Sequence, residues 1–469
     1  MPDPHDAPDA TERYDHVLIG TGQATGTLLA GLPSDATVCA IEAAQVGGSC
    51  INYGCTPTKT LIASAKAAHQ ARRSDAYGVR TGEVTVDGPA VLRRVDQVRR
   101  DSREGLTRFL ESDERITLVR GRGRFVGPRR VQVGDRTIEG GTVHLNVGTR
   151  ARVPEVPGLE DVPWLDSGGL LDLPDLPERL IVLGGSYVGL EMAQAYGRLG
   201  TRVVVLEAGP RVASREDPEI SDAVRTVLEE EGVEIRTGVD VVRVEAEAGG
   251  IRAHVRSADG NADDAVGTHL LVATGRVPNS DGLGLDAAGV ATDEHGFVTV
   301  DDRCRTSADG VYALGDVNGR GAFTHTAVHD AEIVLDELLG NEPARTLDER
   351  TTIYALFTDP PLGRWGLTET QASEAGRRVK VATRSMSKVA RAKEEGRTEG
   401  VIKLVVDADS ERLLGTATFG LHGDELANLF AAFAAGDRPW TALRRTVLVH
   451  PTVGELLPWT LDGLELRED

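Results

Sequence analysis

Two cysteines, Cys50 and Cys55, lie five positions apart in the stretch GGSCINYGCTPTKTL, residues 47–61. Such a pair can form a structural disulfide, a metal site or a redox-active dithiol. A disulfide across so short a loop would gain little entropy, and a zinc site would need a second Cys or His pair at ligand spacing. The other two cysteines, Cys39 and Cys304, are isolated in predicted strands and are expected to be core residues. The context therefore favours a redox pair, and no metal site is expected.

The segment before these cysteines has the pattern of a dinucleotide-binding unit. YDHVLIGTGQATGTLLAGL predicts a strand, a glycine turn and a helix, and TVCAIEA, residues 37–43, predicts a second strand that ends in an acid. In a G-x-G-x-x-G loop, the first two glycines allow the turn and the close approach of a pyrophosphate. Gly20 and Gly22 occupy these positions, and Thr25 stands at the third. Glu42 follows where a carboxylate can hold ribose hydroxyls.

The same pattern returns in LIVLGGSYVGLEMAQAYGRLG, residues 180–200, followed by TRVVVLEAG. Gly184 and Gly189 fit the first and third positions of the loop, and Glu207 is the acid at the end of the second strand. An internal duplication of nucleotide-binding units is the simplest explanation. A carboxylate at Glu207 would repel a 2′-phosphate and therefore favours NADH, although Arg211 four residues later keeps NADPH open.

Two similar stretches, HLNVGTRARVPEVPG and HLLVATGRVPNSDG, predict crossings where the chain leaves the first domain and later returns to it. Farther on, TEGVIKLVVD and RLLGTATFG predict an antiparallel sheet, and ELANLFAAFAAG predicts a helix. We therefore expect an α/β fold with two Rossmann-like dinucleotide-binding domains and a C-terminal α+β domain. The expected segments are a disordered tail at 1–12, a first domain at 13–150 and 276–346, a second domain at 151–275 and the C-terminal domain at 347–469.

The composition restricts the class of partner. Lys and Arg number 52 against 73 Asp and Glu, so the formal charge of −21 argues against nucleic-acid or anionic-membrane binding. The arginine-rich stretch at residues 93–103 lies among apolar residues at helical spacing and predicts a solvated helix face. No apolar run approaches the roughly 18 residues that a membrane span needs. The first residues lack the apolar stretch of a secretory signal, and we expect a soluble, cytoplasmic protein.

The run Gly47–Lys59 closely resembles the active-site signature of the flavoprotein disulfide reductases, which include dihydrolipoamide dehydrogenase, glutathione reductase and mercuric reductase. GVYALGDV, residues 310–317, resembles the second flavin-binding motif of that family, in which Asp316 would reach the ribityl chain. HPTVGE, residues 450–455, resembles its C-terminal His-Pro-Thr…Glu motif. The resemblance extends over essentially the whole chain after the tail.

This resemblance implies that the first domain binds FAD, the second binds NAD and the C-terminal domain forms a homodimer. The cofactor-binding residues that it implies, together with those of the glycine loops, are Gly20, Gly22, Thr25, Glu42, Gly48, Ser49, Lys59, Asp316, Gly184, Gly189, Glu207 and Gly275.

The resemblance also implies a mechanism. Hydride would pass from NADH to FAD, and the flavin would reduce a Cys50–Cys55 disulfide. Cys55 would be the thiolate nearest the flavin, and Cys50 would attack the substrate. His450, oriented by Glu455 and acting on the partner subunit's cysteines, would move the proton, because histidine titrates near neutrality.

Two further expectations follow from the resemblance. Lys59 would lie by the flavin and pair with Glu191, because a buried lysine needs such a partner. The His450–Pro451 peptide bond would be cis, which would direct the imidazole inward.

The substrate is left open by the sequence. GCTPTKTLIASA and AFTHTAVHDAEIVLDELL resemble the mercuric-reductase-like branch, whereas the chain ends LPWTLDGLELRED, without that enzyme's terminal cysteine pair. Trp459, close after the His-Glu motif, is expected to pack at the dimer interface or to reshape the substrate pocket. We expect a small disulfide or a dithiol such as dihydrolipoamide. The alternatives are a metal-ion (Hg or Cu) or quinone reductase, and a redox-inactive or sensory binding protein.

Overall fold

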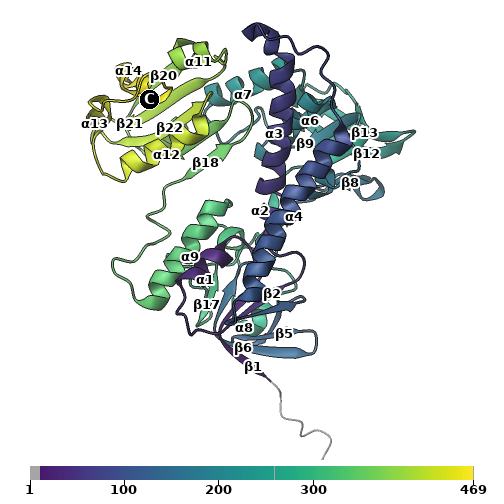
Figure 1. The fold of residues 1–469 in the computed structure, drawn as a ribbon, viewed down its shortest axis with the longest axis vertical. Helices are drawn as coiled ribbons and strands as arrows, with labels where there is room; N and C mark the ends of the chain where they lie inside the picture. Colours follow the sequence, from purple (N-terminus) through teal and green to yellow (C-terminus); the bar gives the residue numbers. More distant parts are fainter. Residues whose placement is uncertain (1–10, 258, 468–469) are drawn as a thin grey trace, which may run out of the picture. The chain divides into compact units, whose positions relative to one another are not determined.

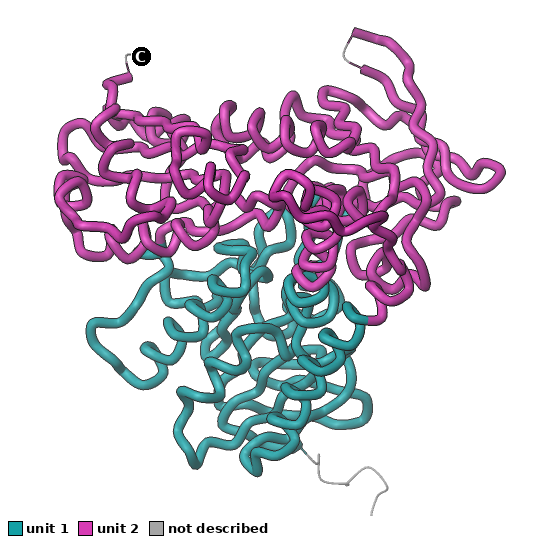
Figure 2. The backbone as a smooth tube through the Cα atoms, turned by 45° about the horizontal axis from the view of Figure 1, so that its top comes forward, with its two compact units in different colours: residues 1–57, 94–152, 275–350 teal, residues 58–93, 153–274, 351–469 magenta. Residues whose placement is uncertain are grey.

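The computed structural model describes residues 11–257 and 259–467. The chain forms two compact units, the first from residues 1–57, 94–152 and 275–350 and the second from residues 58–93, 153–274 and 351–469 (Figure 2). The chain changes unit between Pro57 and Thr58, within helix α3 (Cys55–Arg72), and between Arg93 and Arg94, within helix α4 (Gly88–Ser112). Residues 1–10 of the predicted tail lie outside the described residues, and Glu12 is already the first residue of strand β1.

The first unit is built on a seven-stranded sheet in which β3, β2, β1 and β6 follow one another in parallel. β17 pairs in parallel with the last residues of β6. β5 pairs antiparallel with the first residues of β6, and β4 pairs antiparallel with β5. The strands are β1 (Glu12–Ile19), β2 (Val38–Glu42), β3 (Ile116–Arg120), β4 (Arg124–Gly127), β5 (Arg130–Val133), β6 (Arg136–Leu145) and β17 (Val311–Ala313). A separate pair joins β7 (Thr149–Ala151) to β16 (Arg276–Pro278).

Helices α1 (Ala24–Gly31) and α9 (Thr324–Leu339) lie side by side in the first unit (Figure 1). Leu28 and Leu29 of α1 pack with Ile333 and Val334 of α9 and with Leu18 of β1 in one buried cluster. A second cluster includes residues of β4, β5 and the short helix α8 (Leu285–Ala288). The first of these clusters also contains Ala24 and Ala327, so the loop after β1 and the N-terminal part of α9 are held by a common core.

The second unit contains a five-stranded parallel sheet in the order β11-β10-β9-β15-β8. These strands are β8 (Trp164–Leu165), β9 (Arg179–Leu183), β10 (Arg202–Glu207), β11 (Glu234–Thr237) and β15 (His269–Val272). Its helices include α5 (Ser167–Leu171), α6 (Tyr187–Leu199) and α7 (Pro218–Glu230). A smaller antiparallel sheet joins β12 (Val239–Glu247), β13 (Gly250–Ser257) and β14 (Ala265–Gly267).

The second unit also carries a six-stranded antiparallel sheet in the order β18-β19-β22-β21-β20-β23. The strands are β18 (Ile353–Leu356), β19 (Leu362–Gly366), β20 (Val379–Ser385), β21 (Val401–Asp407), β22 (Leu413–Phe419) and β23 (Glu465–Leu466). Helices α10 (Glu369–Glu374), α11 (Ala390–Glu394), α12 (Gly423–Ala434), α13 (Trp440–Arg444) and α14 (Leu457–Leu461) accompany it. The predicted α/β class with a C-terminal antiparallel-sheet domain is confirmed. Within the described part of the chain, no helix combines the length and apolar character of a membrane span.

Candidate active site

The helix that carries Cys50, α2 (Gly48–Asn52), is attached directly to the glycine loop that follows β1. Gly47 donates its backbone N–H to the Thr21 carbonyl at 3.1 Å, and the Gln23 amide donates to the Gly47 carbonyl at 2.9 Å. Gly48 has φ +61°, and a Cβ there would come within 3.0 Å of the Gly22 Cα. Only glycine allows this close approach. The Gly48 prediction therefore has a steric basis in the packing of α2 against the loop.

The two predicted redox cysteines converge on one hydroxyl. Cys50 is partly buried in α2, and Cys55 is the exposed first residue of α3. The Thr324 hydroxyl, at the first residue of α9, donates to Cys50 Sγ at 3.1 Å and lies 3.7 Å from Cys55 Sγ. The sequence pattern did not single out Thr324. Its only signal is its place in the stretch AFTHTAVHDAEIVLDELL, which resembles the mercuric-reductase-like branch.

The first glycine loop has the shape that a diphosphate requires. Gly20 has φ +91°, and a side chain there would clash with the Asn146 carbonyl. A Cβ on Gly22 would come within 2.8 Å of Asn146 Oδ1. The N-terminus of α1 has no side-chain cap and no acid in its first turn. The first backbone N–H groups of a helix without a side-chain cap are available to bind an anion.

Thr25 was predicted to bind the cofactor, and its side chain is fully buried and accepts a hydrogen bond from Asn146 Nδ2 at 3.0 Å. This position is the third of the glycine motif, where the helix packs closely on the strand. The Thr25 hydroxyl thus braces the loop from inside, and any contribution to cofactor binding goes through its backbone.

Glu42 at the end of β2 and Glu207 at the end of β10 make equivalent hydrogen bonds to the two glycine loops. Each carboxylate accepts one N–H from the residue after the first glycine of its loop and one from the residue two positions after itself. The donors are Thr21 (3.0 Å) and Ala44 (2.8 Å) for Glu42, and Gly185 (2.6 Å) and Gly209 (2.7 Å) for Glu207. A carboxylate has about four lone-pair sites, so capacity remains for the ribose hydroxyls that were predicted.

The second glycine loop repeats the steric demands of the first. Gly184 has φ +106°, and a Cβ there would lie 2.5 Å from the Ala273 carbonyl oxygen. A side chain at Gly189 would clash with the Gly184 carbonyl, because α6 packs tightly on β9. Gly275, in the first unit, has φ +120° and directly precedes β16. Positive φ at Gly184 and Gly275, and the close Gly184 carbonyl at Gly189, explain why glycine stands at the three positions.

Asp316 belongs to a polar cluster that sequence reasoning found only in part. Its carboxylate accepts a hydrogen bond from the Thr149 hydroxyl at 2.8 Å and lies 3.9 Å from Arg276 Nε. Arg276 also donates to Thr149 Oγ1 at 2.7 Å and reaches Ser49 Oγ at 3.4 Å. Arg276 therefore connects the predicted flavin-motif residue Asp316 with Ser49 of α2. The sequence analysis missed Arg276, although it named the neighbouring Gly275.

The predicted Lys59–Glu191 ion pair is present in the second unit. Lys59 Nζ lies 2.8 Å from Glu191 Oε2, and the other Glu191 oxygen accepts the Phe357 backbone N–H at 2.8 Å. The Lys59 ammonium also stands over the Phe357 ring, 4.6 Å from its centroid. Each oxygen of the buried carboxylate thus has a hydrogen-bond partner, and the carboxylate holds the lysine in one position.

The predicted His450–Glu455 pair is also present, with His450 Nδ1 2.8 Å from Glu455 Oε2. The His450–Pro451 peptide bond is cis, as expected. The imidazole is 74% exposed, whereas Glu455 is mostly buried. Trp459 is exposed in the second unit, with the Arg444 guanidinium 5.6 Å from its ring centroid. The carboxylate therefore fixes one ring nitrogen while the ring remains open to solvent in the single chain.

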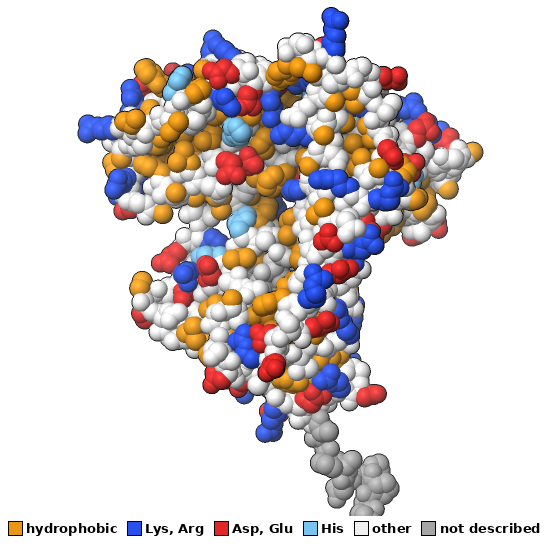
Figure 3. All heavy atoms as spheres, viewed as in Figure 1, with side chains coloured by type: hydrophobic (Ala, Val, Ile, Leu, Met, Phe, Trp, Pro, Cys, Tyr) orange, Lys and Arg blue, Asp and Glu red, His pale blue; other side chains and the backbone are white. Residues whose placement is uncertain are grey.

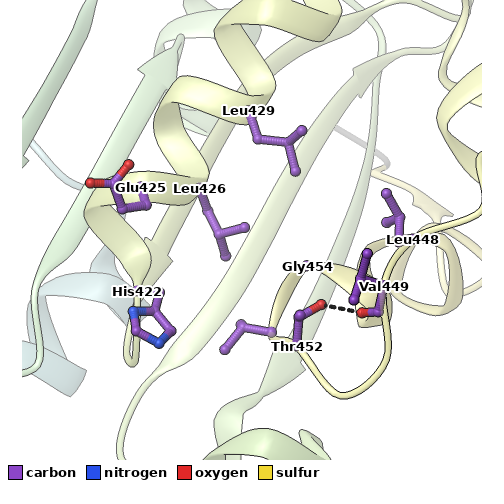
Figure 4. A pocket seen from close by; sticks show the side chains of 9 residues that line it. His422, Glu425, Leu426, Leu429, Leu448, Val449, Thr452 and Gly454 are labelled. Atoms are coloured by element: carbon purple, nitrogen blue, oxygen red, sulfur yellow. Dashed lines mark hydrogen bonds between the residues drawn. The ribbon is translucent and has the colours of Figure 1, made fainter.

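An apolar hollow of about 250 Å³ lies beside the His450 segment, between α12 and the chain around residues 448–454 (Figure 4). Leu426 and Leu429 of α12 and Leu448 and Val449 line it, and the Thr452 hydroxyl donates to the Val449 carbonyl at 2.7 Å. Figure 3 shows hydrophobic side chains gathered at the upper left, over the segment that carries α12 and α13.

Cys39 and Cys304 are fully buried, which confirms the expectation that they are core residues. Burial raises the pKa of the Cys39 thiol to about 12 and also raises the pKa of Cys304. Such thiols are inert at neutral pH. Among the described residues, no group of three or more His, Cys, Asp or Glu side chains is arranged to hold a metal ion.

Family models match most of the chain. Residues 14–331 match the model described as pyridine nucleotide-disulphide oxidoreductase, and residues 352–461 match the dimerisation domain of the same family.

Three curated relatives illustrate the range of similar proteins. The probable pyridine nucleotide-disulfide oxidoreductase RclA of Escherichia coli K12 is 34% identical over 95% of this chain and 98% of its own length. A dihydrolipoyl dehydrogenase of Thermus scotoductus is 34% identical, with 96% and 97% covered. A mercuric reductase of Streptomyces lividans is 35% identical, with 86% and 85% covered.

A solved structure supports the same relationship. The Cu(II) complex of the HOCl-induced flavoprotein disulfide reductase RclA from E. coli has a TM-score of 0.86 and 32% identity, and the match covers 96% of this chain and 99% of that one. The predicted resemblance is confirmed: the chain belongs to the pyridine nucleotide-disulphide oxidoreductases.

Proposed function

We propose that this enzyme uses NADH and FAD to reduce a small disulfide, or in reverse to oxidise a dithiol, through Cys50 and Cys55. The observation that carries the proposal is the convergence of both sulfur atoms on the Thr324 hydroxyl, on a helix attached to the first glycine loop. Two thiols held together in this way can form and release a disulfide.

The residues of the first unit fit FAD. Gly20 and Gly22 leave room for a diphosphate at the uncapped start of α1, and Glu42 retains acceptor capacity for ribose hydroxyls. Asp316 and Ser49 are connected through Arg276 next to that loop. Bound FAD, reduced by NADH, would supply the two electrons that return a Cys50–Cys55 disulfide to two thiols.

The chain's own side chains supply the exchange chemistry. The Cys50 thiolate attacks one sulfur of the substrate disulfide, which forms a mixed disulfide and expels a thiolate. Protonated His450 gives its proton to that leaving thiolate, and Glu455 stabilises and orients the ring. The Cys55 thiolate then attacks the Cys50 sulfur, which expels the second half of the substrate as a thiolate and leaves the Cys50–Cys55 disulfide.

The active unit is a homodimer in this proposal. Residues 352–461 match a dimerisation domain, and Val447 and Val449 beside the hollow are 96% and 75% exposed in the single chain. Exposed apolar side chains next to a hollow suit a protein interface. The open face of the His450 imidazole is then available to the Cys50 of the other chain.

NADH is the proposed electron donor. Glu207 ends β10 and holds the second glycine loop through Gly185 and Gly209, so its negative charge is fixed at the nucleotide site. A fixed carboxylate accepts bonds from ribose hydroxyls and repels a 2′-phosphate.

Metal-ion reduction is the second candidate. It is favoured by the similarity to the solved Cu(II) complex of E. coli RclA. Thiolates are soft ligands that suit copper, and Cys55 is exposed.

A turnover panel tests these proposals. NADH oxidation is measured with lipoamide, small disulfides, Hg(II), Cu(II) and a quinone as acceptors. We expect sustained turnover with at least one disulfide, its loss in Cys50→Ser and its retention in the buried-cysteine control Cys39→Val. Sustained turnover only with a metal ion or a quinone would contradict the leading proposal.

A further inference from the structure

Helix α9 carries a row of residues that starts at the two thiols. Thr324, its first residue, contacts the sulfur atoms of both Cys50 and Cys55. Val328 and Glu332 follow at intervals of four residues, so they lie on the same side of the helix as Thr324. At about 1.5 Å per residue, Val328 stands roughly 6 Å and Glu332 roughly 12 Å farther along the helix axis. The row therefore leads from the reacting sulfur atoms outwards along α9.

This side of α9 is open to a bound molecule. Val328 and Glu332 are half-buried, and the Glu332 side chain is 39% exposed. The Cα–Cβ bonds of a helix tilt towards its N-terminus, so the Glu332 side chain starts back towards the thiols. Helix α1, which lies beside α9 in Figure 1, contains no charged residue. A molecule that is bound to Cys50 and extends along α9 therefore passes a neutral helix and an apolar side chain before it meets Glu332.

Glu332 retains negative charge although a cation is near. Its carboxylate lies 3.7 Å from Arg345 Nε. The same guanidinium lies 2.9 Å from the Asp336 carboxylate, which also accepts the Arg345 backbone N–H. Burial lowers the pKa of the neighbouring His329, so this ring adds no positive charge at neutral pH. One cation is thus shared between two carboxylates, and a net negative charge remains.

We propose that Glu332 is a specificity-determining residue that favours disulfides with positively charged arms over disulfides with anionic arms. The arm is the group attached to the sulfur that Cys50 attacks. An ammonium group on an arm that runs past Val328 is attracted by the carboxylate, whereas a carboxylate or sulfonate is repelled. The role in turnover rests on the proposed function. The charge preference at Cys50 can be measured without a physiological substrate, so the two proposals can fail separately.

The test compares two reagents of opposite charge, trimethylammonioethyl and sulfonatoethyl methanethiosulfonate. The purified full-length Cys55→Ala protein is reduced, desalted and labelled at Cys50 at low ionic strength, where charge effects are weakly screened. The Cys50 thiolate attacks the thioether-type sulfur of the reagent, which forms a mixed disulfide and releases methanesulfinate. The ratio of the two labelling rates, cationic over anionic, reports the electrostatic potential at Cys50.

We expect Glu332→Gln to lower this ratio by about fourfold, because a unit charge roughly 10 Å away in water acts in opposite directions on the two reagents. Glu332→Lys should lower the ratio further. Glu337→Gln is the matched control, because Glu337 belongs to the same helix, faces another side and pairs with Arg305 at 3.1 Å. An unchanged ratio in Glu332→Gln, or an equal decrease in Glu337→Gln, would overturn the proposal.

Turnover gives a second measurement. NADH oxidation is followed with cystamine and with dithiodipropionate, whose short arms carry opposite charges. Wild type should have the higher kcat/KM with cystamine, and Glu332→Gln should reduce this preference mainly through KM. A higher wild-type kcat/KM with dithiodipropionate would overturn the charge preference. Absence of turnover with every disulfide tested would contradict the proposed function, and the labelling ratio would still decide the role of Glu332.

Discussion

Buried His144 and its half-buried neighbour His16, both in the first unit, should make the protein less stable in acid. His144 of β6 is fully buried, its Nε2 lies 3.0 Å from Thr142 Oγ1 and 3.4 Å from His16 Nδ1, and its ring stacks on Tyr312. Burial and, to a smaller extent, the nearby His16 together lower the pKa of His144 to about 3. Burial also lowers the pKa of His16.

The sign follows from proton binding in the two states. Between pH 6.5, the ordinary pKa of histidine, and pH of about 3, His144 is protonated in the unfolded chain and stays neutral in the folded chain. The free energy of unfolding therefore falls as the pH falls through this range. Relative to pH 8, His144 alone should remove about 2 kcal/mol at pH 5, because each of the roughly 1.5 units below 6.5 counts about 1.4 kcal/mol.

The perturbation is His144→Phe, which keeps an aromatic ring beside Tyr312 and removes the titrating group. Hydrogen exchange of β1 and β6 peptides, corrected for intrinsic rates, reports the stability of the first unit at pH 8 and pH 5. The variant loses its bond to Thr142 at every pH, but its decrease in stability between pH 8 and pH 5 should be smaller than that of wild type by about 2 kcal/mol. His295→Gln, at an exposed histidine, should keep the wild-type difference. Parallel losses in wild type and His144→Phe would refute the reasoning.

Four further predictions concern the site. Glu207→Arg should shift preference from NADH towards NADPH, mainly in kcat/KM, and a wild type that already prefers NADPH tenfold would contradict the assignment. His450→Ala should slow disulfide turnover by roughly 10²–10⁴-fold, the usual contribution of a positioned acid–base group. Mixing His450→Ala with Cys50→Ser chains should restore activity, because a mixed dimer holds one complete site, and no recovery after proven subunit exchange would place the base in its own chain. Hg(II) should inhibit the enzyme at low concentration, because Cys50 and Cys55 would trap it and the buried Cys39 and Cys304 cannot take it over. Steady release of elemental mercury would contradict this prediction.

The sequence alone determined the features that depend on local backbone chemistry. Gly20 and Gly184 were predicted as loop residues, and both adopt a positive φ beside a carbonyl that a side chain would hit. The repeated pattern of strand, glycine turn and helix predicted two Rossmann-like domains, and each unit contains parallel strands in the expected arrangement. The motif around Cys50 and Cys55 predicted the redox pair and the family. Such features are visible in sequence because each is specified by residues that are close together in the chain.

The tertiary structure decided which distant side chains serve these residues. Thr324 lies more than 260 positions from both cysteines, and Arg276 lies 227 positions from Ser49. The sequence predicted that Glu42 binds a ribose. Only the fold shows that its carboxylate accepts hydrogen bonds from Thr21 in the first glycine loop. A single threonine or arginine carries no pattern that predicts such a contact. Its partner is selected when the sheet order and the packing of α9 and β16 bring separate segments together.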